Sequence, residues 1–334
     1  MCIMRSRTPL CALRPVCCVV LFAGVIAATT LLTAQEGRSP AQGNHDPQTA
    51  LISTGDIDLF WRAFDKWTMA SGRDPGKLSG ILETDYIERG SQGVQDFIPD
   101  RIVSCEALAE TILKDPKYYE DVRPSTEKMQ SFVPQIREGF VRLKEMYPDA
   151  VFPPVYFVIG RRTSGGTDSP NGLIIGAEMF STDSRIQMDD VVPMVIHELI
   201  HYQQKRHAAD LMTAVMNEGA ADFIAELIVG HNIDEVAKAY GDSHEEELWN
   251  KFQRELKSGD LRPWLYNGGD KNRVGPPDLG YYIGYKICQS IYERSTNKAG
   301  TVKAIIVMED PKAIIRQSGY AQRFSNSHTP VTKN

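Results

Sequence analysis

The sequence predicts a mostly helical α+β fold in which a small sheet precedes a histidine-bearing helix. Three patterns lead to this prediction. Apolar residues recur at helical spacing through the N-terminal part, two short runs rich in β-branched residues follow at 155–159 and 173–175, and nearly everything from Asp189 onward has helical periodicity. With 42% hydrophobic and 24% charged residues, the composition is that of a globular protein. It excludes a disordered, a collagen-like or a multi-span membrane protein.

The first 34 residues differ from the rest of the chain. They carry three arginines and no acidic residue, and the stretch from Val16 to Ala34 has no charge. A basic start, an apolar stretch and small residues at its end are typical of a secretory signal peptide. The alternative is an uncleaved anchor, because the 19 residues of that stretch are just long enough to span a bilayer. We therefore expect a periplasmic or secreted protein, with any membrane contact made through an uncleaved N-terminus.

Two cysteines, Cys105 and Cys288, remain after this leader. In an exported chain they could form a disulfide, and two buried thiols are equally compatible with the sequence. The net charge is −6, and it would be −9 without the leader, from 34 basic and 43 acidic residues. This acidic balance gives no electrostatic reason to expect a nucleic-acid partner. The sequence does not indicate an oligomeric state.

The segments before the sheet are predicted in chain order. Residues 35–52 are polar and rich in turn formers, which indicates a flexible linker. Thr54 is placed to open a helix, and the aromatic residues from Phe60 to Trp67 recur at helical spacing, which predicts core packing. The run Pro124–Glu127 has the character of a helix start, so we predict a helix from there to about Tyr147.

The two β-branched runs are Val155–Ile159 and Leu173–Ile175. Residues 161–170 between them are full of turn formers. We predict a hairpin with a long loop.

The motif H-E-x-x-H stands at His197, Glu198 and His201. Four residues of α-helix turn the chain by about 400°, so the two histidines lie about 40° apart on one face and can reach one ion. Neutral imidazole is a ligand for Zn²⁺, and a glutamate beside it can take a proton from water at the ion. These residue types at this spacing predict a catalytic zinc site.

The surroundings of the motif strengthen the prediction. The intervening residues Leu199 and Ile200, and most of 191–196, are apolar, so the helix is expected to be buried. In the alternative reading the histidines and the glutamate are ordinary polar residues. Burying them is costly unless something ligates or pairs with them.

Two residues compete for the place of third ligand. His207 stands at the spacing of the third histidine of metzincins, but Gln204 occupies the position where that pattern has a glycine that breaks the helix. On an unbroken helix His207 would lie about 120° away from His201. Glu218 follows His201 by 17 residues, which leaves room for a turn and a returning helix that we expect to begin near Asn217.

Asp222 supports the choice of Glu218. It lies four residues further on and therefore on the same helix face, where it could orient a ligating imidazole. The alternative is a solvated acidic face that Glu226 continues. We predict that His197, His201 and Glu218 are metal ligands and that Asp222 orients a ligating imidazole.

H-E-x-x-H followed by N-E-x-x-x-D resembles the gluzincin pattern of thermolysin-like peptidases. The resemblance implies that Glu218 is the third zinc ligand, that Asp222 bonds the first histidine, and that Glu198 is the general base. Gluzincins also supply a Tyr or His that donates a hydrogen bond to the reaction's oxyanion. We expect Tyr285 in this role and Tyr281 as the second candidate, while aromatic core packing is the alternative for both.

The chain more broadly resembles the bacterial zinc-dependent protease family related to gliding motility lipoprotein B. The segments that carry this resemblance are Asp56–Asp65, the hairpin, His197–Gln204 and Gly280–Tyr285. It implies a zincin-like catalytic domain and an activity class without a substrate. In gluzincins an edge strand before the zinc helix holds the peptide, and Gly172–Phe180 stands in that place. Gly176–Met179 is also similar, in another order, to the G-A-M-E-N motif of aminopeptidases.

We interpret the chain as a leader or anchor (1–34), a flexible linker (35–52) and one domain (53–325). Within the domain we expect a helical part (53–150), the hairpin (151–182), the zinc-site helices (187–230) and C-terminal helices (231–325).

The predicted function is an exported zinc-dependent peptidase acting on a peptide or protein. A non-catalytic envelope, secretion or motility protein with a structural metal is the rival, and hydrolysis of a non-peptide amide is a third possibility. Glu198 favours catalysis, because a structural site needs a fourth protein ligand and no base.

Overall fold

The computed structural model describes residues 43–325 apart from 71, 182–185, 205–209, 258, 271–272 and 274. These residues belong to one compact unit of the chain, Pro40–Asn334. The predicted leader and the first part of the linker lie outside the described residues, and so does His207. Within the described part of the chain, no helix is both long and apolar enough to cross a membrane. Cys105 and Cys288 are free thiols.

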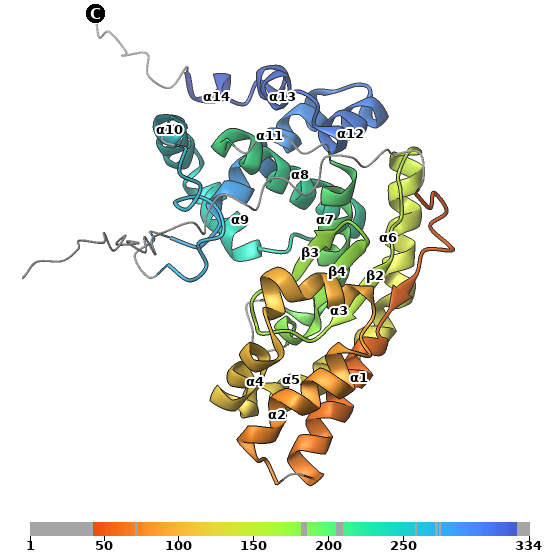
Figure 1. The fold of residues 1–334 in the computed structure, drawn as a ribbon. Helices are drawn as coiled ribbons and strands as arrows, with labels where there is room; N and C mark the ends of the chain where they lie inside the picture. Colours follow the sequence, from red (N-terminus) through yellow and green to blue (C-terminus); the bar gives the residue numbers. More distant parts are fainter. Residues whose placement is uncertain are drawn as a thin grey trace, which may run out of the picture. The chain divides into compact units, whose positions relative to one another are not determined.

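The N-terminal part is helical, as predicted (Figure 1). Its α-helices are α1 (Gly55–Asp65), α2 (Pro75–Leu82), α3 (Gln92–Phe97), α4 (Cys105–Lys114), α5 (Pro116–Thr126) and α6 (Val133–Met146). The first three continue into π-helical turns at Lys66–Ala70, Glu83–Ile87 and Ile98–Ile102, and a 3-10 turn, Met129–Phe132, precedes α6. Side chains of Asp74, Ser91, Ser104 and Asp115 cap α2 to α5 by accepting backbone N–H bonds.

The predicted helix start at Pro124 is wrong. Pro124 lies inside α5, and α6 begins at Val133. The stronger start signal is upstream, where Asp115 caps the helix and Pro116 occupies its first position. α5 ends at Thr126, two residues beyond Pro124.

The aromatic residues of α1 pack in the core, as their spacing predicts. Phe60, Phe64 and Trp67 are almost fully buried. Phe60 contacts the ring of Tyr86, whose hydroxyl donates to the carbonyl of Ile159 at 2.7 Å. This hydrogen bond ties the aromatic core to Ile159, the residue that directly follows the strand at 155–158.

The sheet has four strands, β1 (Ile52–Ser53), β2 (Val155–Val158), β3 (Gly166–Ser169) and β4 (Gly172–Gly176), in the order β1-β2-β4-β3. β1 pairs with β2 and β2 with β4 in parallel, while β3 and β4 are antiparallel. The sheet lies between α7 (Val191–Gln203) and the helices α1 and α3 (Figure 1). This arrangement places β3 and β4 against α7, the helix with the H-E-x-x-H motif.

The predicted hairpin between 155–159 and 173–175 is wrong. These segments pair in parallel, with Val155 opposite Leu173. The hairpin is instead formed by β3 and β4 through the turn at 170–171. β3 is polar and lacks apolar alternation, so its sequence does not distinguish it from a loop. The edge strand is therefore β3, and β4 lies between two strands.

Two carboxylates brace this region. Asp96 on α3 accepts hydrogen bonds from Ser169 Oγ at 2.6 Å and from Asn171 Nδ2 at 2.9 Å, which fixes the β3–β4 turn. Glu178, in the 3-10 turn Ala177–Met179, is 0% exposed, so it is inaccessible to a substrate. Its Oε1 accepts the backbone N–H of Arg162, and its Oε2 has no hydrogen-bond partner among the described residues. Burial raises the pKa of Glu178 to about 7.

We predict that Glu178→Gln removes a pH-dependent part of the stability. The folded-state pKa of Glu178 is raised above its usual value, so its favourable contribution is complete below about pH 4.5 and is lost as the pH rises through about 7. The loss amounts to at most about 3 kcal/mol. Urea unfolding between pH 5 and 8 should show a flatter profile for Glu178→Gln than for the wild type. Glu110→Gln, at an exposed position of α4, is the control, and identical profiles for all three proteins would contradict the prediction.

Most of the described chain from residue 189 onward is helical, as predicted. A 3-10 turn, Met188–Asp190, leads into α7, and the later helices are α8 (Leu211–Val229), α9 (Glu235–Ser243), α10 (Glu245–Glu255), α11 (Leu279–Arg294), α12 (Lys298–Val307), α13 (Pro311–Ser318) and α14 (Gln322–Ser325). α8 begins at Leu211, before the expected Asn217, because Asp210 caps it by accepting the N–H of Thr213. The mostly helical α+β prediction is confirmed.

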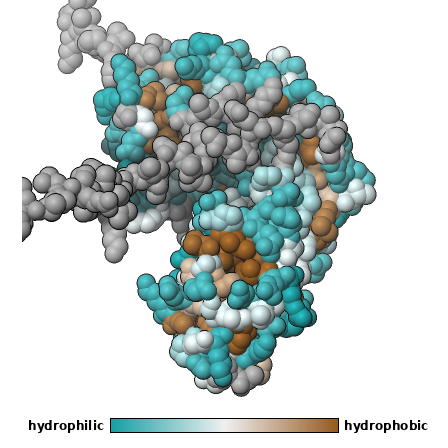
Figure 2. All heavy atoms as spheres, viewed as in Figure 1, coloured by the Kyte–Doolittle hydropathy of each residue, from teal (hydrophilic) through white to brown (hydrophobic). Residues whose placement is uncertain are grey.

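Figure 2 shows a largely hydrophilic surface with separate apolar areas. Single exposed apolar residues are normal on a globular protein. The large ones among the described residues are Leu51, Met69, Val103, Val236 and Tyr266.

Helices α8 and α11 cross in near backbone contact. A Cβ atom on Gly219 would lie 2.1 Å from the backbone nitrogen of Tyr285, and one on Gly284 would lie 2.0 Å from the carbonyl oxygen of Val215. Any side chain at either position would push the helices apart. The close crossing brings α11 up to the helices that carry the predicted metal ligands.

We predict that Gly284→Ala destabilises the protein by about 1–3 kcal/mol or more, because a buried methyl group must displace backbone. Gly80→Ala is the matched control, since a Cβ there meets no atom within 4 Å. This control should be neutral or slightly stabilising. The measurement is the free energy of unfolding in urea, and equal values for the two variants would contradict the close-contact explanation.

Candidate metal centre

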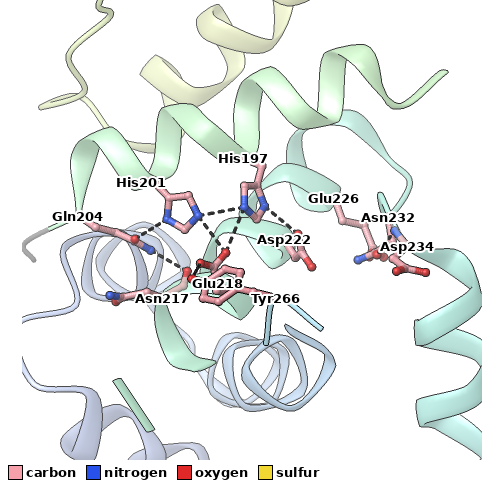
Figure 3. A network of polar contacts seen from close by, with 10 residues as sticks. All are labelled: His197, His201, Gln204, Asn217, Glu218, Asp222, Glu226, Asn232, Asp234 and Tyr266. Atoms are coloured by element: carbon pink, nitrogen blue, oxygen red, sulfur yellow. Dashed lines mark hydrogen bonds and ion pairs between the residues drawn. The ribbon is translucent and has the colours of Figure 1, made fainter. Parts of the chain in front are cut away.

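Helix α7 brings His197 and His201 to one face, as their spacing predicts. Their Nε2 atoms are 2.9 Å apart (Figure 3). His197 is buried and His201 is nearly so. The residues around them on α7 are apolar and buried, so the two imidazoles lie in a largely dry environment.

Helix α8 supplies a carboxylate to the same point. Glu218 Oε2 lies 3.1 Å from His201 Nε2 and 3.4 Å from His197 Nε2. In a tetrahedral zinc site with bonds of about 2.0–2.1 Å, ligand atoms are about 3.3–3.4 Å apart. The three atoms already have nearly this spacing, so the residues fit a zinc ion.

Each histidine has a partner on its other ring nitrogen. Asp222 Oδ1 lies 2.8 Å from His197 Nδ1, and Gln204 Oε1 lies 2.8 Å from His201 Nδ1. Both oxygens accept, so each Nδ1 carries the hydrogen and each Nε2 of a neutral ring presents a lone pair. Two nitrogen lone pairs and the Glu218 carboxylate oxygen therefore converge on one point, which a cation would satisfy.

The backbone at Gln204 differs from our expectation of an unbroken helix. Helix α7 ends at Gln203, and Gln204 has extended backbone angles. The chain thus leaves the helix at this point, so the unbroken-helix argument against His207 does not hold. Gln204 Nε2 also donates to the carbonyl of Asn217 at 2.9 Å, and this bond ties the end of α7 to α8.

The residues of the cluster shift one another's pKa values. Burial opposes protonation of His197, but the hydrogen bonds with Asp222 and Glu218 outweigh it and raise its pKa well above the usual value. Burial favours the neutral form of Glu218, yet the charge of His201 and the histidine hydrogen bonds hold its pKa well below the usual range. The hydrogen bonds and charges within the cluster therefore favour a proton on imidazole and the ionised form of Glu218.

The side chain of Glu198, a residue of α7, lies against the edge strand β3. It is 6% exposed, and burial raises its pKa. A Cβ on Gly166 of β3 would lie 2.6 Å from Glu198 Oε1, so the strand backbone runs directly over this carboxylate. Gly166 belongs to a segment that the sequence analysis assigned to a loop.

The two tyrosines of α11 that the sequence offered as oxyanion donors lie in different surroundings. The ring of Tyr281 stacks on His197, with centroids 6.1 Å apart and planes 17° from parallel. Tyr285 instead packs against Phe223 and is hydrogen-bonded to Glu226. Its contacts thus match the core-packing alternative, and Tyr281 is the one that touches a predicted ligand.

Tyr266 is a site residue that the sequence analysis missed. Its hydroxyl donates to Glu218 Oε1 at 2.5 Å (Figure 3). It lies 48 residues after Glu218 in a segment without helical or strand periodicity. No motif marks it, because its approach to Glu218 depends on how the chain folds back between α10 and α11.

Comparison with known proteins points to the same region. Residues 162–316, just under half of the chain, match the family model described as "Predicted Zn-dependent protease (DUF2268)". No curated protein and no solved structure matches the chain. The matched range contains the whole His197–His201–Glu218 cluster, so the comparison and the geometry both support a zinc-protease class of site. The gluzincin type and the relation to gliding motility stay predictions.

We predict that the purified protein binds one zinc ion per chain and that Glu218→Ala or His201→Ala abolishes this binding. Zinc at a thousand times its dissociation constant should stabilise the wild type by about 4 kcal/mol. Because the pKa of His197 is raised, protons compete with the metal, and zinc affinity should fall as the pH is lowered. Metal analysis and thermal unfolding with and without chelator measure both effects.

His45→Ala is the control for this prediction, since His45 bonds the carbonyl of Ala150 outside the cluster. Zinc content that is unchanged in Glu218→Ala would contradict the assignment.

Proposed function

We propose that the protein is an exported zinc-dependent peptidase whose ligands are His197, His201 and Glu218. The observation that carries the proposal is the convergence of three electron-pair donors on one buried point, with Asp222 and Gln204 holding both rings in the required tautomer. Such partners on the outer nitrogens are characteristic of metal-binding histidines. The class of the matched region supports the same choice of metal and reaction.

A zinc ion held there would supply Lewis-acid polarisation of a peptide carbonyl and would acidify water. In the proposed mechanism Glu198 accepts a proton from the attacking water and delivers it to the leaving amine. Its burial supports this role, because a raised pKa makes the carboxylate a better base near neutral pH. Asp222 keeps the hydrogen on His197 Nδ1 throughout.

Two tyrosines contact the cluster, Tyr266 through its hydroxyl on Glu218 and Tyr281 through its ring on His197. We place the donor to the developing oxyanion at Tyr281, in place of Tyr285, because the single hydroxyl proton of Tyr266 is already donated to Glu218. Both rings lie near the ligands, and they contact each other edge to face with centroids 6.4 Å apart.

The edge strand supports a peptide as the substrate. β3 is terminal in the described sheet, and its Gly166 runs over Glu198. An extended peptide could add to the outer edge of β3 through main-chain hydrogen bonds and so present a peptide bond to the centre. A small non-peptide amide would make no use of this edge.

The structural-metal rival is less well supported. A structural zinc site closes its coordination with four protein ligands. Among the described residues the group of side chains able to hold one ion has three members, His197, His201 and Glu218. Three ligands beside a buried glutamate fit a catalytic site better.

The proposed location and partners follow from the chain as a whole. The basic and apolar start supports export, with the N-terminus as the proposed contact with a membrane. The net charge of −6 supports a peptide or protein partner over a nucleic acid.

We predict that Glu198→Gln lowers peptide hydrolysis by at least about a hundredfold while zinc content stays the same, because the amide keeps the shape but cannot accept the proton. The measurement is digestion of a peptide library by the mature protein, followed by mass spectrometry, together with metal analysis of both proteins.

Undiminished cleavage by Glu198→Gln would contradict the role of this residue. Bound zinc without cleavage of any peptide by the wild type would favour the structural-metal rival.

A further inference from the structure

Tyr266 is held in an unusual backbone conformation by anchors on both sides. Its φ angle is +58°, in the left-handed region that non-glycine residues rarely adopt. Before it, the carbonyl of Trp264 accepts the N–H of Gly280 at 2.8 Å. After it, Asn267 and Asp278 exchange two hydrogen bonds from backbone N–H to side-chain oxygen, at 2.8 and 2.9 Å. The loop is thereby fastened to the start of α11.

The side chain of Tyr266 is mostly in solvent while its hydroxyl is at the centre. The residue is 64% exposed, whereas its neighbours Trp264 and Leu265 are buried. Burial of the ring therefore does not explain why the backbone is held in a strained conformation. A defined polar contact that this conformation provides is the 2.5 Å bond from the hydroxyl to Glu218 Oε1.

The two oxygens of Glu218 have different neighbours. Oε2 faces both histidine nitrogens, and Oε1 accepts the hydroxyl of Tyr266. A carboxylate can bind a metal through one oxygen or through both. A hydroxyl bound to Oε1 engages the oxygen that would otherwise turn towards the metal.

We propose that Tyr266 is a positioning residue that makes Glu218 a one-oxygen metal ligand and so keeps one coordination place for water and substrate. This inference rests on the proposed zinc centre. The two anchors hold the strained loop in the backbone conformation that directs the Tyr266 hydroxyl towards Oε1. Loop, anchors and hydroxyl therefore act together. The carboxylate is thus positioned from the α11 side of the molecule as well as from its own helix.

The test compares Tyr266→Phe with the wild type after loading with Zn²⁺ or Co²⁺. The variant keeps the exposed ring and loses the hydroxyl. We expect zinc affinity, measured by competition with a chromogenic chelator, to fall about ten- to a hundredfold. We also expect the visible absorption of the Co²⁺ form to lose intensity, as the site moves from four-coordinate towards five-coordinate when Glu218 binds through both oxygens.

Tyr292→Phe is the matched control. It also removes a tyrosine hydroxyl, and its ring lies on α11 against Phe223, outside the cluster. It should leave affinity and spectrum unchanged. Asn267→Ala, which loosens the anchor but keeps the hydroxyl, should move the Co²⁺ spectrum in the same direction as Tyr266→Phe and by less.

The outcomes separate this inference from the proposed function. A Tyr266→Phe protein with wild-type zinc affinity and an unchanged Co²⁺ spectrum overturns the positioning role and leaves the peptidase proposal standing. A wild type that binds metal but cleaves no peptide overturns the peptidase proposal, and the two metal measurements still decide the role of Tyr266. A wild type that binds neither metal overturns both.

Discussion

The structure depends on helices α7 and α8, which face each other across a buried group of polar atoms. His197, His201, Glu218 and Asp222 lie in an apolar interior where each would be costly by itself. The cost is offset because every member has a partner, and because three of them converge on a point that suits a cation. The close approach of the two helices is therefore a condition both for the fold and for the proposed chemistry.

The elements around these helices fix what can reach that point. Gly219 and Gly284 let α11 approach α8 closely, and this approach places Tyr281 on His197. On the other side, Gly166 lets the edge strand pass directly over Glu198. Close backbone contacts thus bring a tyrosine face, a strand edge and a carboxylate to one buried centre, without any of them being near another in the sequence.

The sequence revealed the parts of the site that follow from helical geometry. The pairs His197–His201 and Glu218–Asp222 are each four residues apart, so their common faces are dictated by the helix itself. The positions of Gln204 and Tyr266 depend on where the chain leaves one helix and enters the next. The local sequence pattern does not determine this. The same limit explains the wrong hairpin, because strand periodicity predicts which residues are buried but not whether a neighbouring strand runs parallel.

The two histidines have different partners, and charge explains the difference. In the proposed zinc site, ionised Glu218 and Asp222 would together supply two negative charges, which would balance a divalent cation. A carboxylate in place of Gln204 would add a third fixed charge in a buried place, whereas its amide accepts the same hydrogen bond without charge. Glu198 is then the carboxylate left outside this balance. In the proposed mechanism it is the group that gains and loses a proton without disturbing the neutrality of the ligand cluster.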